Sequence, residues 1–382
     1  MAPVTNIADL RDIARRRIPL AMFEYAQRGS YDERTLAANY AELDALRLRQ
    51  RVMVDVSKRN VATTFLGQDV TIPVGIAPTG LTGLFHADGE ILGARAAQAF
   101  GVPFTLSTMS ICSIEDVAGA VDKPFWFQLY VMRDRAFTQS LVERARAAGC
   151  PVLVLTLDLA AHGQRHRDIK NGLSVPPRLT LANALDIATK PGWAMNVLRG
   201  RRRSFGNLQG WMPAGKNVNA MAQWVAQQFD PSLSWKDVAW IRSLWPGKLV
   251  LKGILDPEDA RIAADHGADA IVVSNHGGRQ LDSAPASISV LPEIASAVGS
   301  RTEILLDGGI RTGQDVLKAL ALGARGCLIG RSWLYGLAAG GQGGVTQVLE
   351  ILRKELDTSM ALAGLTDVRS VTPAALHTPR RV

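Results

Sequence analysis

Hydrophobic residues along the chain gather in eight short continuous runs, and each run ends in polar or glycine residues. Between most of these runs the apolar positions recur with helical spacing, as in Arg133–Ala148 and Pro257–His266. Continuous apolar strands that alternate with helices are typical of a parallel sheet buried on both faces. The predicted strands cover residues 72–78, 103–107, 125–130, 152–158, 248–253, 270–276, 303–309 and 326–331.

Eight strands are the number that a (β/α)8 TIM barrel needs, and the sequence therefore predicts this α/β fold. A doubly wound Rossmann sheet is the alternative, but no G-x-G-x-x-G motif follows the first strand. The starts of the fourth and fifth strands lie 96 residues apart, whereas the other intervals run from 22 to 33 residues. We therefore expect an insertion of about 60–70 residues after strand four.

The domain organisation follows from these intervals. We expect one domain over residues 1–382, with a helical cap over residues 1–70 and an amphipathic closing helix over residues 345–363. The insertion contains a basic and aromatic loop over residues 176–217. No 18-residue uncharged apolar stretch exists, so no transmembrane helix is expected, and the start of the chain lacks the apolar core of a secretory signal.

The net charge changes the interpretation of the insertion. The 382 residues carry 43 Lys and Arg against 35 Asp and Glu, a formal net charge of +8, and residues 176–216 account for +6 of it. Basic residues interleaved with aromatic and apolar ones suit an anionic lipid headgroup layer. A solvated loop is the alternative, and nucleic acid is disfavoured because no binding fold or wider basic surface accompanies the patch. The residues in question are Arg199–Arg203, Trp193, Leu198, Phe205, Trp211 and Met212.

Cysteine usage narrows the chemistry. Cys112, Cys150 and Cys327 are odd in number and far apart, which indicates a reducing compartment and argues against a disulfide framework. The same spacing argues against a cysteine metal site, and we expect no metal. A composition of 47% hydrophobic residues with 35 glycines fits a globular α/β protein.

Polar or ionisable side chains stand at the carboxyl end of nearly every predicted strand. In a (β/α)8 barrel these ends meet at one rim, where active sites are built. A barrel kept only for stability has no need of so many polar groups there, so the pattern predicts a site for a polar ligand. The strand-end residues are Thr79, Ser107, Thr108, Gln128, Tyr130, Thr156, Asp158, Lys252, Ser274, His276, Asp307, Gly309, Gly330 and Arg331.

Two segments at this rim carry the sharpest signals. In Ser274–Asp282, His276 is suited to act as a base near neutral pH and Arg279 can pair with a carboxylate. A histidine bonded within a tight turn is the alternative. Asp307–Arg311 and Gly330–Arg331 end strands seven and eight, where such barrels often bind phosphate. Ordinary glycine turns with surface arginines are the alternative there.

These motifs resemble one family closely. The segments SNHGGRQLD (274–282), LVLKGIL (249–255), DGGIRTGQDVLKALALGA (307–324) and IGR (329–331) are similar to those of FMN-dependent α-hydroxy-acid dehydrogenases and oxidases. The resemblance extends to IAPTGL (76–81), WFQLY (126–130) and GQRHRDIKNGL (163–173), and runs almost to the C-terminus. FQLYVMRDR and KGILDPEDA resemble the bacterial respiratory L-lactate dehydrogenases of this family most, followed by its membrane-bound mandelate dehydrogenases.

The resemblance implies an FMN cofactor and oxidation of an (S)-2-hydroxy acid to the 2-oxo acid, with L-lactate to pyruvate as the expected reaction. It also implies a quinone or cytochrome acceptor, a peripheral location on the cytoplasmic face of the inner membrane, and a homotetramer. A mandelate-type dehydrogenase and an oxygen-using oxidase are the alternatives within the family. A non-redox phosphate-binding barrel or a basic membrane-binding module would leave Lys252, His276 and Arg279 unexplained.

The roles of individual residues are likewise implied by the resemblance. His276 is the expected base with Asp158 as its partner, taking either the hydroxyl proton as hydride passes to the flavin or the α-proton to give a carbanion. Lys252 is expected beside flavin N1, although a strand-end lysine reaching solvent is commoner. The remaining expected contacts are Arg279, Arg165 and Tyr25 on the substrate carboxylate, Tyr130 on the reacting oxygen, Thr79, Ser107, Gln128 and Thr156 on the flavin ring, Ser274 on the cofactor, and Asp307, Gly309, Arg311, Gly330 and Arg331 on the ribityl chain and phosphate.

Three positions that vary within the family bear on specificity. Met109 stands where glycolate oxidases carry tryptophan, so the pocket is expected to admit substrate side chains larger than hydrogen. His162 takes a position that is commonly leucine, so the wall of the pocket on the substrate side departs from the family's pattern. Gly80 stands where several oxidases have alanine, which favours a dehydrogenase.

Overall fold

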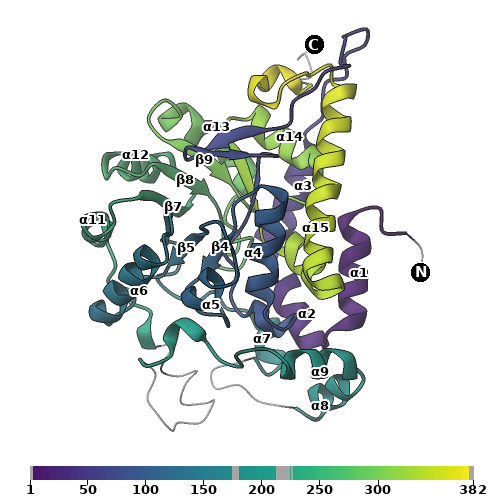
Figure 1. Cartoon of the computed structure of the whole chain (residues 1–382). Coiled ribbons are helices and arrows are strands. Elements are labelled where there is room, and N and C mark those ends of the chain that lie inside the picture. Colours follow the sequence, from purple (N-terminus) through teal and green to yellow (C-terminus); the bar gives the residue numbers. More distant parts are fainter. Residues whose placement is uncertain (1–2, 174–179, 212–223, 225–226, 378–382) are drawn as a thin grey trace.

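Eight parallel strands form a closed barrel in the computed structural model, which describes residues 3–173, 180–211, 224 and 227–377 (Figure 1). The hydrogen-bonded order is β3-β10-β9-β8-β7-β6-β5-β4, and a parallel bridge between Ile76 and Phe104 joins the two outer strands. The (β/α)8 prediction is confirmed, and all eight predicted strands are present. They are β3 (Val74–Ile76), β4 (Thr105–Ser107), β5 (Trp126–Leu129), β6 (Val152–Thr156), β7 (Lys248–Ile254), β8 (Ala270–Val273), β9 (Glu303–Leu306) and β10 (Gly326–Ile329).

The strands are apolar without alternation because both of their faces are buried. In β6, Val152 and Val154 join the cluster inside the barrel, while Leu153 and Leu155 pack outward against the helices. A hairpin of β1 (Thr63–Phe65) and β2 (Gln68–Val70) closes the amino-terminal end of the barrel, where Phe65 meets Trp126 edge to face at 5.9 Å. The opposite, carboxyl end is therefore the open one.

Helices surround the barrel. The expected helices over residues 133–148 and 257–266 are confirmed as α6 and α12. The helices are α1 (Ile7–Arg17), α2 (Leu20–Gln27), α3 (Arg34–Ala45), α4 (Gly89–Phe100), α5 (Ile114–Ala118), α6 (Arg135–Ala147), α7 (His166–Lys170), α8 (Leu181–Ala188), α9 (Pro191–Leu198), α11 (Trp235–Leu244), α12 (Pro257–Asp265), α13 (Ser287–Val298), α14 (Gly313–Ala321) and α15 (Arg331–Leu362).

Two regions differ from the sequence expectation. Within residues 1–70 the helices α1–α3 end at Ala45, and the hairpin follows instead of further helix. The closing helix begins at Arg331 rather than near residue 345, and it is interrupted at Gly340 and Gly341. Its first half is buried on nearly all sides, from Ser332 to Ala339, so it shows no helical alternation of apolar and polar residues.

The inserted segment leaves the barrel after β6 and carries α7, α8 and α9. Figure 1 shows α8 and α9 at the lower edge of the molecule, beneath α2 and outside the ring of barrel helices. Met212 and the other residues of the predicted loop at 176–179 and 213–217 lie outside the described part of the chain. No helix in the described ranges is long and apolar enough to cross a membrane.

Candidate active site

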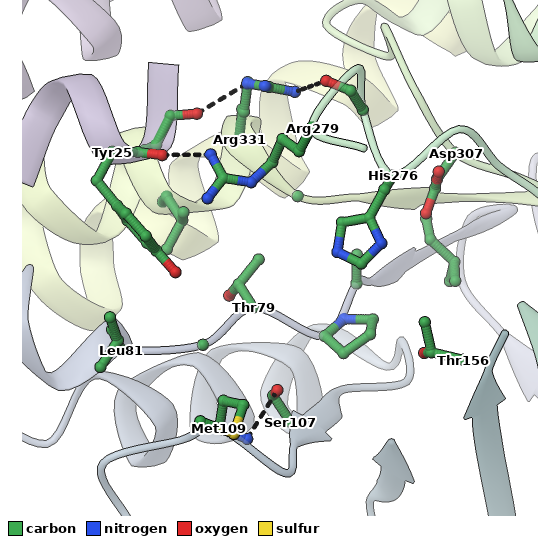
Figure 2. A pocket seen from close by; sticks show the side chains of 18 of the residues that line it. Tyr25, Thr79, Leu81, Ser107, Met109, Thr156, His276, Arg279, Asp307 and Arg331 are labelled. Atoms are coloured by element: carbon green, nitrogen blue, oxygen red, sulfur yellow. Dashed lines mark hydrogen bonds between the residues drawn. The ribbon is translucent and has the colours of Figure 1, made fainter. Parts of the chain in front are cut away.

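A cavity of about 540 Å³ opens at the carboxyl ends of the strands. Figure 2 shows His276, Arg279 and Tyr25 around the same space. Of the predicted site residues, Asp158, Gln128 and Ser274 lie behind the wall and act through their neighbours. The others line the cavity, namely Tyr25, Thr79, Ser107, Tyr130, Thr156, Arg165, Lys252, His276, Arg279, Asp307, Gly309, Arg311, Gly330 and Arg331.

His276 and Asp158 form a pair at the rim. The Nδ1 atom of His276 lies 2.9 Å from Asp158 Oδ1. Burial disfavours the charged form of Asp158, but the charge and hydrogen bond of His276 and the charge of Lys252 outweigh it, so the pKa of Asp158 is lowered. An ionised carboxylate only accepts hydrogen bonds, so Nδ1 carries the proton and Nε2 is left free to accept one.

The loop around His276 is held in an uncommon backbone conformation. His276 has a φ of +57°, a left-handed value that surrounding contacts must maintain. The amides of Asn275 and Asn39 bond to each other reciprocally at 2.8 and 2.9 Å, and Asn275 Oδ1 also accepts from the N–H of Gly278. Asn39 belongs to α3, so a helix from the start of the chain fixes this loop. Sequence analysis missed Asn39, whose only signal is a polar residue on a helix face that becomes buried.

Two guanidinium groups face the cavity beside the histidine. Arg279 lies over the ring of Tyr25, 4.7 Å from its centroid, and donates to the backbone carbonyls of Tyr25 and Arg28. Arg165 donates to Gln280 Oε1 at 3.3 Å. Burial and the charge of Arg165 lower the pKa of Arg279, and among the described residues neither arginine forms an ion pair. This unsatisfied positive charge suits a carboxylate ligand.

Tyr130 lies on the same side of the cavity. Burial raises the pKa of its hydroxyl far above the usual value, with a further contribution from the charge of Asp158. The hydroxyl therefore stays protonated and can donate a hydrogen bond to a ligand oxygen.

Lys252 is buried and does not reach solvent. Its side chain is 5% exposed, its Nζ lies 2.7 Å from Asp307 Oδ2, and it donates to Ser274 Oγ at 2.7 Å. Ser274 thus supports Lys252 instead of lining the cavity. Asp307 Oδ1 and Thr79 Oγ1 are buried without a hydrogen-bond partner among the described residues, which leaves polar atoms for a ligand to satisfy.

A row of polar side chains crosses three strands at the cavity floor. Gln128 accepts from Ser107 Oγ and donates to Thr156 Oγ1, both at 3.0 Å. Ser107 Oγ in turn accepts from the N–H of Met109 at 3.1 Å. Gln128 therefore orients Ser107 and Thr156, which themselves face the cavity.

The ends of β9 and β10 form the far side of the cavity. Gly330 precedes α15 without a side-chain cap, and a Cβ added there would meet only Thr79, at 3.9 Å, so the helix N-terminus is open to a ligand anion. Position 309 requires glycine because of a close contact: an added Cβ would lie 2.4 Å from the carbonyl oxygen of Asn39. Arg311 contacts the ring of Tyr40, and Arg331 donates to the carbonyls of Ala26, Gly277 and Arg28. Both arginines are half-buried, which argues against simple surface residues.

Several wall residues were not found from the sequence. Phe229 contacts His162 edge to face, with ring centroids 4.4 Å apart, and burial together with the charge of Arg165 lowers the pKa of His162. A Cβ at Gly80 would lie 3.1 Å from the Cβ of Met109, so alanine there would crowd Met109. Most of the missed wall residues come from segments with no pattern of their own, whereas Met22 lies on α2 and Tyr40 on α3. The missed wall residues include Met22, Tyr40, Leu81, Leu84, Ile111, Leu173, Arg203, Ser204 and Phe229.

Comparison with known proteins places this site in a family. A family model described as FMN-dependent dehydrogenase matches residues 14–378. The chain belongs to this family. The resemblance stated from the motifs is thereby confirmed, and with it FMN as the cofactor of this dehydrogenase.

Relatives of this FMN-dependent dehydrogenase extend over its whole length. The L-lactate dehydrogenase of Caulobacter vibrioides is 48% identical over 374 residues, covering 98% of this chain and 97% of its own. That of Ectopseudomonas mendocina is 47% identical over 97% of each chain. Among solved structures, a monotopic membrane protein, (S)-mandelate dehydrogenase, has a TM-score of 0.93 with 37% identity, covering 98% of this chain and 100% of the other.

The residues present fit FMN. The buried partnerless oxygens of Asp307 and Thr79 can bond a polar cofactor, and the buried cation Lys252 stands beside them. The open helix N-terminus at Gly330 suits a phosphate. This dehydrogenase therefore has, in one cavity, groups for a flavin phosphate at one side and for a carboxylate at the other.

Proposed function

We propose that this FMN-dependent dehydrogenase oxidises L-lactate to pyruvate and passes the electrons to a quinone or cytochrome. The observation that carries the proposal is the hydrogen bond between Asp158 and His276 Nδ1, with His276 facing the same cavity as Arg165 and Arg279. A base beside two guanidinium groups without acidic partners suits a substrate that bears a hydroxyl next to a carboxylate. The names of the curated relatives, at 45–48% identity, support lactate as that substrate.

The residues divide the reaction between them. Arg279 and Arg165 bind the carboxylate, with Tyr25 beneath Arg279, and Tyr130 donates to the reacting oxygen. His276 Nε2 takes a proton from the substrate, and Asp158 stabilises the imidazolium that results. When bound, FMN supplies the acceptor for the two electrons that leave the substrate carbon. We assign its ring to Thr79, Ser107, Thr156 and Lys252, supported from behind by Gln128 and Ser274, and its ribityl phosphate to Asp307, Gly309, Arg311, Gly330 and Arg331.

Anaerobic mixing with L-lactate is expected to bleach the flavin fully, because the carboxylate clamp and the base are both in place. Mandelate, glycolate and longer hydroxy acids, offered at equal concentration, are expected to reduce it more slowly. The measurement is the loss of flavin absorbance after rapid mixing. Faster flavin reduction by mandelate than by lactate would identify mandelate as the substrate instead. Peroxide formation at a rate equal to that of quinone reduction would favour an oxidase.

We also propose that the inserted segment attaches the protein to the cytoplasmic face of the inner membrane. The helices α8 and α9 bury no residue, and four of their apolar side chains are more than half exposed, namely Leu181, Leu185, Met195 and Leu198. Their polar groups face the protein instead, where Asp186 accepts from the N–H of Leu20 and Trp193 donates to the carbonyl of Leu84. Helices that turn their apolar faces outward suit a lipid surface.

The basic cluster contributes less free charge than the sequence suggests. Arg202 forms an ion pair with Asp116, and the Nε atom of Arg201 lies 3.7 Å from Asp88 Oδ2. These two arginines tie the insertion to the barrel. Among the described residues of the insertion, Arg199 and Lys190 remain as cations for a lipid headgroup, while Arg203 lines the cavity. The single-domain organisation remains part of the proposal, supported by the full-length matches to the relatives. A homotetramer remains part of it on the motif resemblance alone.

Removal of residues 177–215 is expected to release the protein from membranes, because the exposed apolar faces of α8 and α9 leave with them. The measurement is the fraction that sediments with membranes after cell lysis. Flavin content serves as the control for folding. A deletion variant that sediments as fully as the parent would contradict membrane attachment through the insertion.

A further inference from the structure

The inserted helices rest against a corner of the protein formed by the end of α1 and the start of α2. Lys190 Nζ donates to the carbonyl of Arg16 at 2.9 Å, and the N–H of Leu20 donates to Asp186 Oδ2 at 2.6 Å. Figure 1 shows α8 and α9 directly beneath this part of the chain. We name Arg15, Arg16 and Leu20 the α1–α2 corner. The corner and the insertion thus form one continuous surface.

The chemistry of the corner matches that of the insertion. Arg15 and Arg16 are exposed, and Leu20 is nearly half exposed beside the apolar face of α8. Arg17 differs from them, since its guanidinium donates to the carbonyl of Ala339. Favourable interaction with the α1 dipole explains a cation in the last helical turn, but it does not explain an exposed leucine beside it.

Acidic groups near the corner are already engaged. Asp12 of α1 pairs with Arg11 at 2.9 Å, and Asp186 of α8 accepts from the backbone of Leu20. In the described part of the chain, Arg15 and Arg16 have no ion pair or side-chain hydrogen bond. Their charge is therefore available to an external anion.

We infer that the α1–α2 corner is a second membrane contact, in which Arg15 and Arg16 bind the phosphates of anionic lipids. The inference rests on the proposed attachment through the insertion. Interfacial helices sink about 5–10 Å into the boundary between headgroups and acyl chains, and a helix is about 10 Å in diameter. If α8 lies at that boundary, Arg15 and Arg16 of α1 lie about one helix diameter further from the acyl chains, at the depth of the headgroup phosphates. Leu20 then lies beside Leu181 and Leu185, at the edge of the acyl chains.

This docking also orients the cavity. Met22, two residues after Leu20, lines the cavity together with Leu84, whose carbonyl accepts from Trp193 of the insertion. The corner widens the surface that meets the membrane, and a wider contact limits the tilt of the protein more than the insertion alone does. The corner thereby holds this rim of the cavity near the lipid surface, where a membrane-borne acceptor would approach.

Vesicle binding of the FMN-loaded full chain tests the inference. The vesicles are phosphatidylcholine alone and phosphatidylcholine with phosphatidylglycerol, and the variant is R15Q/R16Q. The matched control is R49Q/R51Q, two exposed arginines that lie near the far end of α15, where the N–H of Arg51 donates to the carbonyl of Leu362. That end lies about 30 Å along α15 from Ala339, which Arg17 contacts.

We expect R15Q/R16Q to bind the anionic vesicles about 30-fold more weakly, from the contribution of each cation near an anionic surface. Binding to phosphatidylcholine should remain at the parent level, and so should flavin reduction by lactate. Equal weakening by the two double variants, or no weakening by R15Q/R16Q, would overturn the inference. The deletion of residues 177–215 separates the two claims. If the deletion variant loses vesicle binding while R15Q/R16Q binds as the parent does, the contact at the α1–α2 corner is refuted and attachment through the insertion stands. If the deletion variant keeps its binding, attachment through the insertion is refuted.

Discussion

Replacing His276 by glutamine is expected to leave FMN bound and to slow flavin reduction by L-lactate by about 10⁴-fold, the upper end of what a general base contributes. Glutamine keeps a polar side chain at the rim but cannot accept a proton from the substrate at neutral pH. The ring and phosphate contacts assigned to the flavin come from other strands, so cofactor binding should be unaffected. Anaerobic rapid mixing measures the rate, and the flavin spectrum measures occupancy.

The Asp158→Asn variant is the matched control for this experiment. It keeps the shape of the pair at 2.9 Å but removes the charge that stabilises the imidazolium. We expect a rate between those of the parent and the His276→Gln variant, with FMN still bound. Normal bleaching by lactate in His276→Gln would refute the assignment of the base, and a parent rate in Asp158→Asn would refute the role of the carboxylate.

The barrel was predictable from sequence because its strands are buried on both faces, which leaves continuous apolar runs at regular intervals. The elements that were missed lack any such signature. The strands of the β1–β2 hairpin have three residues each, too few to show alternation, and the first half of α15 is apolar on nearly all sides. Such elements are specified by the surfaces they cover rather than by their own pattern.

The site was predictable to the same degree and for a related reason. The carboxyl ends of parallel strands meet at one rim, so the polar residues that follow the strands had to converge. Whether a side chain faces the cavity or supports a neighbour depends on tertiary contacts, as the positions of Gln128 and Ser274 show. Asn39, which pairs with Asn275 at a separation of 236 positions, could be found only in the folded chain.

Replacing Lys252 by methionine is expected to lower the free energy of unfolding by about 3–5 kcal/mol, since it leaves Asp307 buried without its cation. The ion pair is short, at 2.7 Å, and both side chains are at most 10% exposed. The bond to Ser274 Oγ is lost as well. Urea unfolding followed by tryptophan fluorescence, with FMN present at saturation, measures the change. Flavin reduction by lactate should also slow, because the cation assigned to the reduced ring is missing.

The double variant K252M/D307N separates these two effects. Removing the carboxylate charge together with its partner avoids the uncompensated buried ion, so stability should return to within about 1–2 kcal/mol of the parent. Flavin reduction should stay slow in the double variant, because neutralising Asp307 restores the charge balance but not the cation. If instead the double variant is as unstable as K252M, packing rather than charge explains the loss. Recovery of the parent reduction rate would remove Lys252 from the reaction and leave it only a structural role.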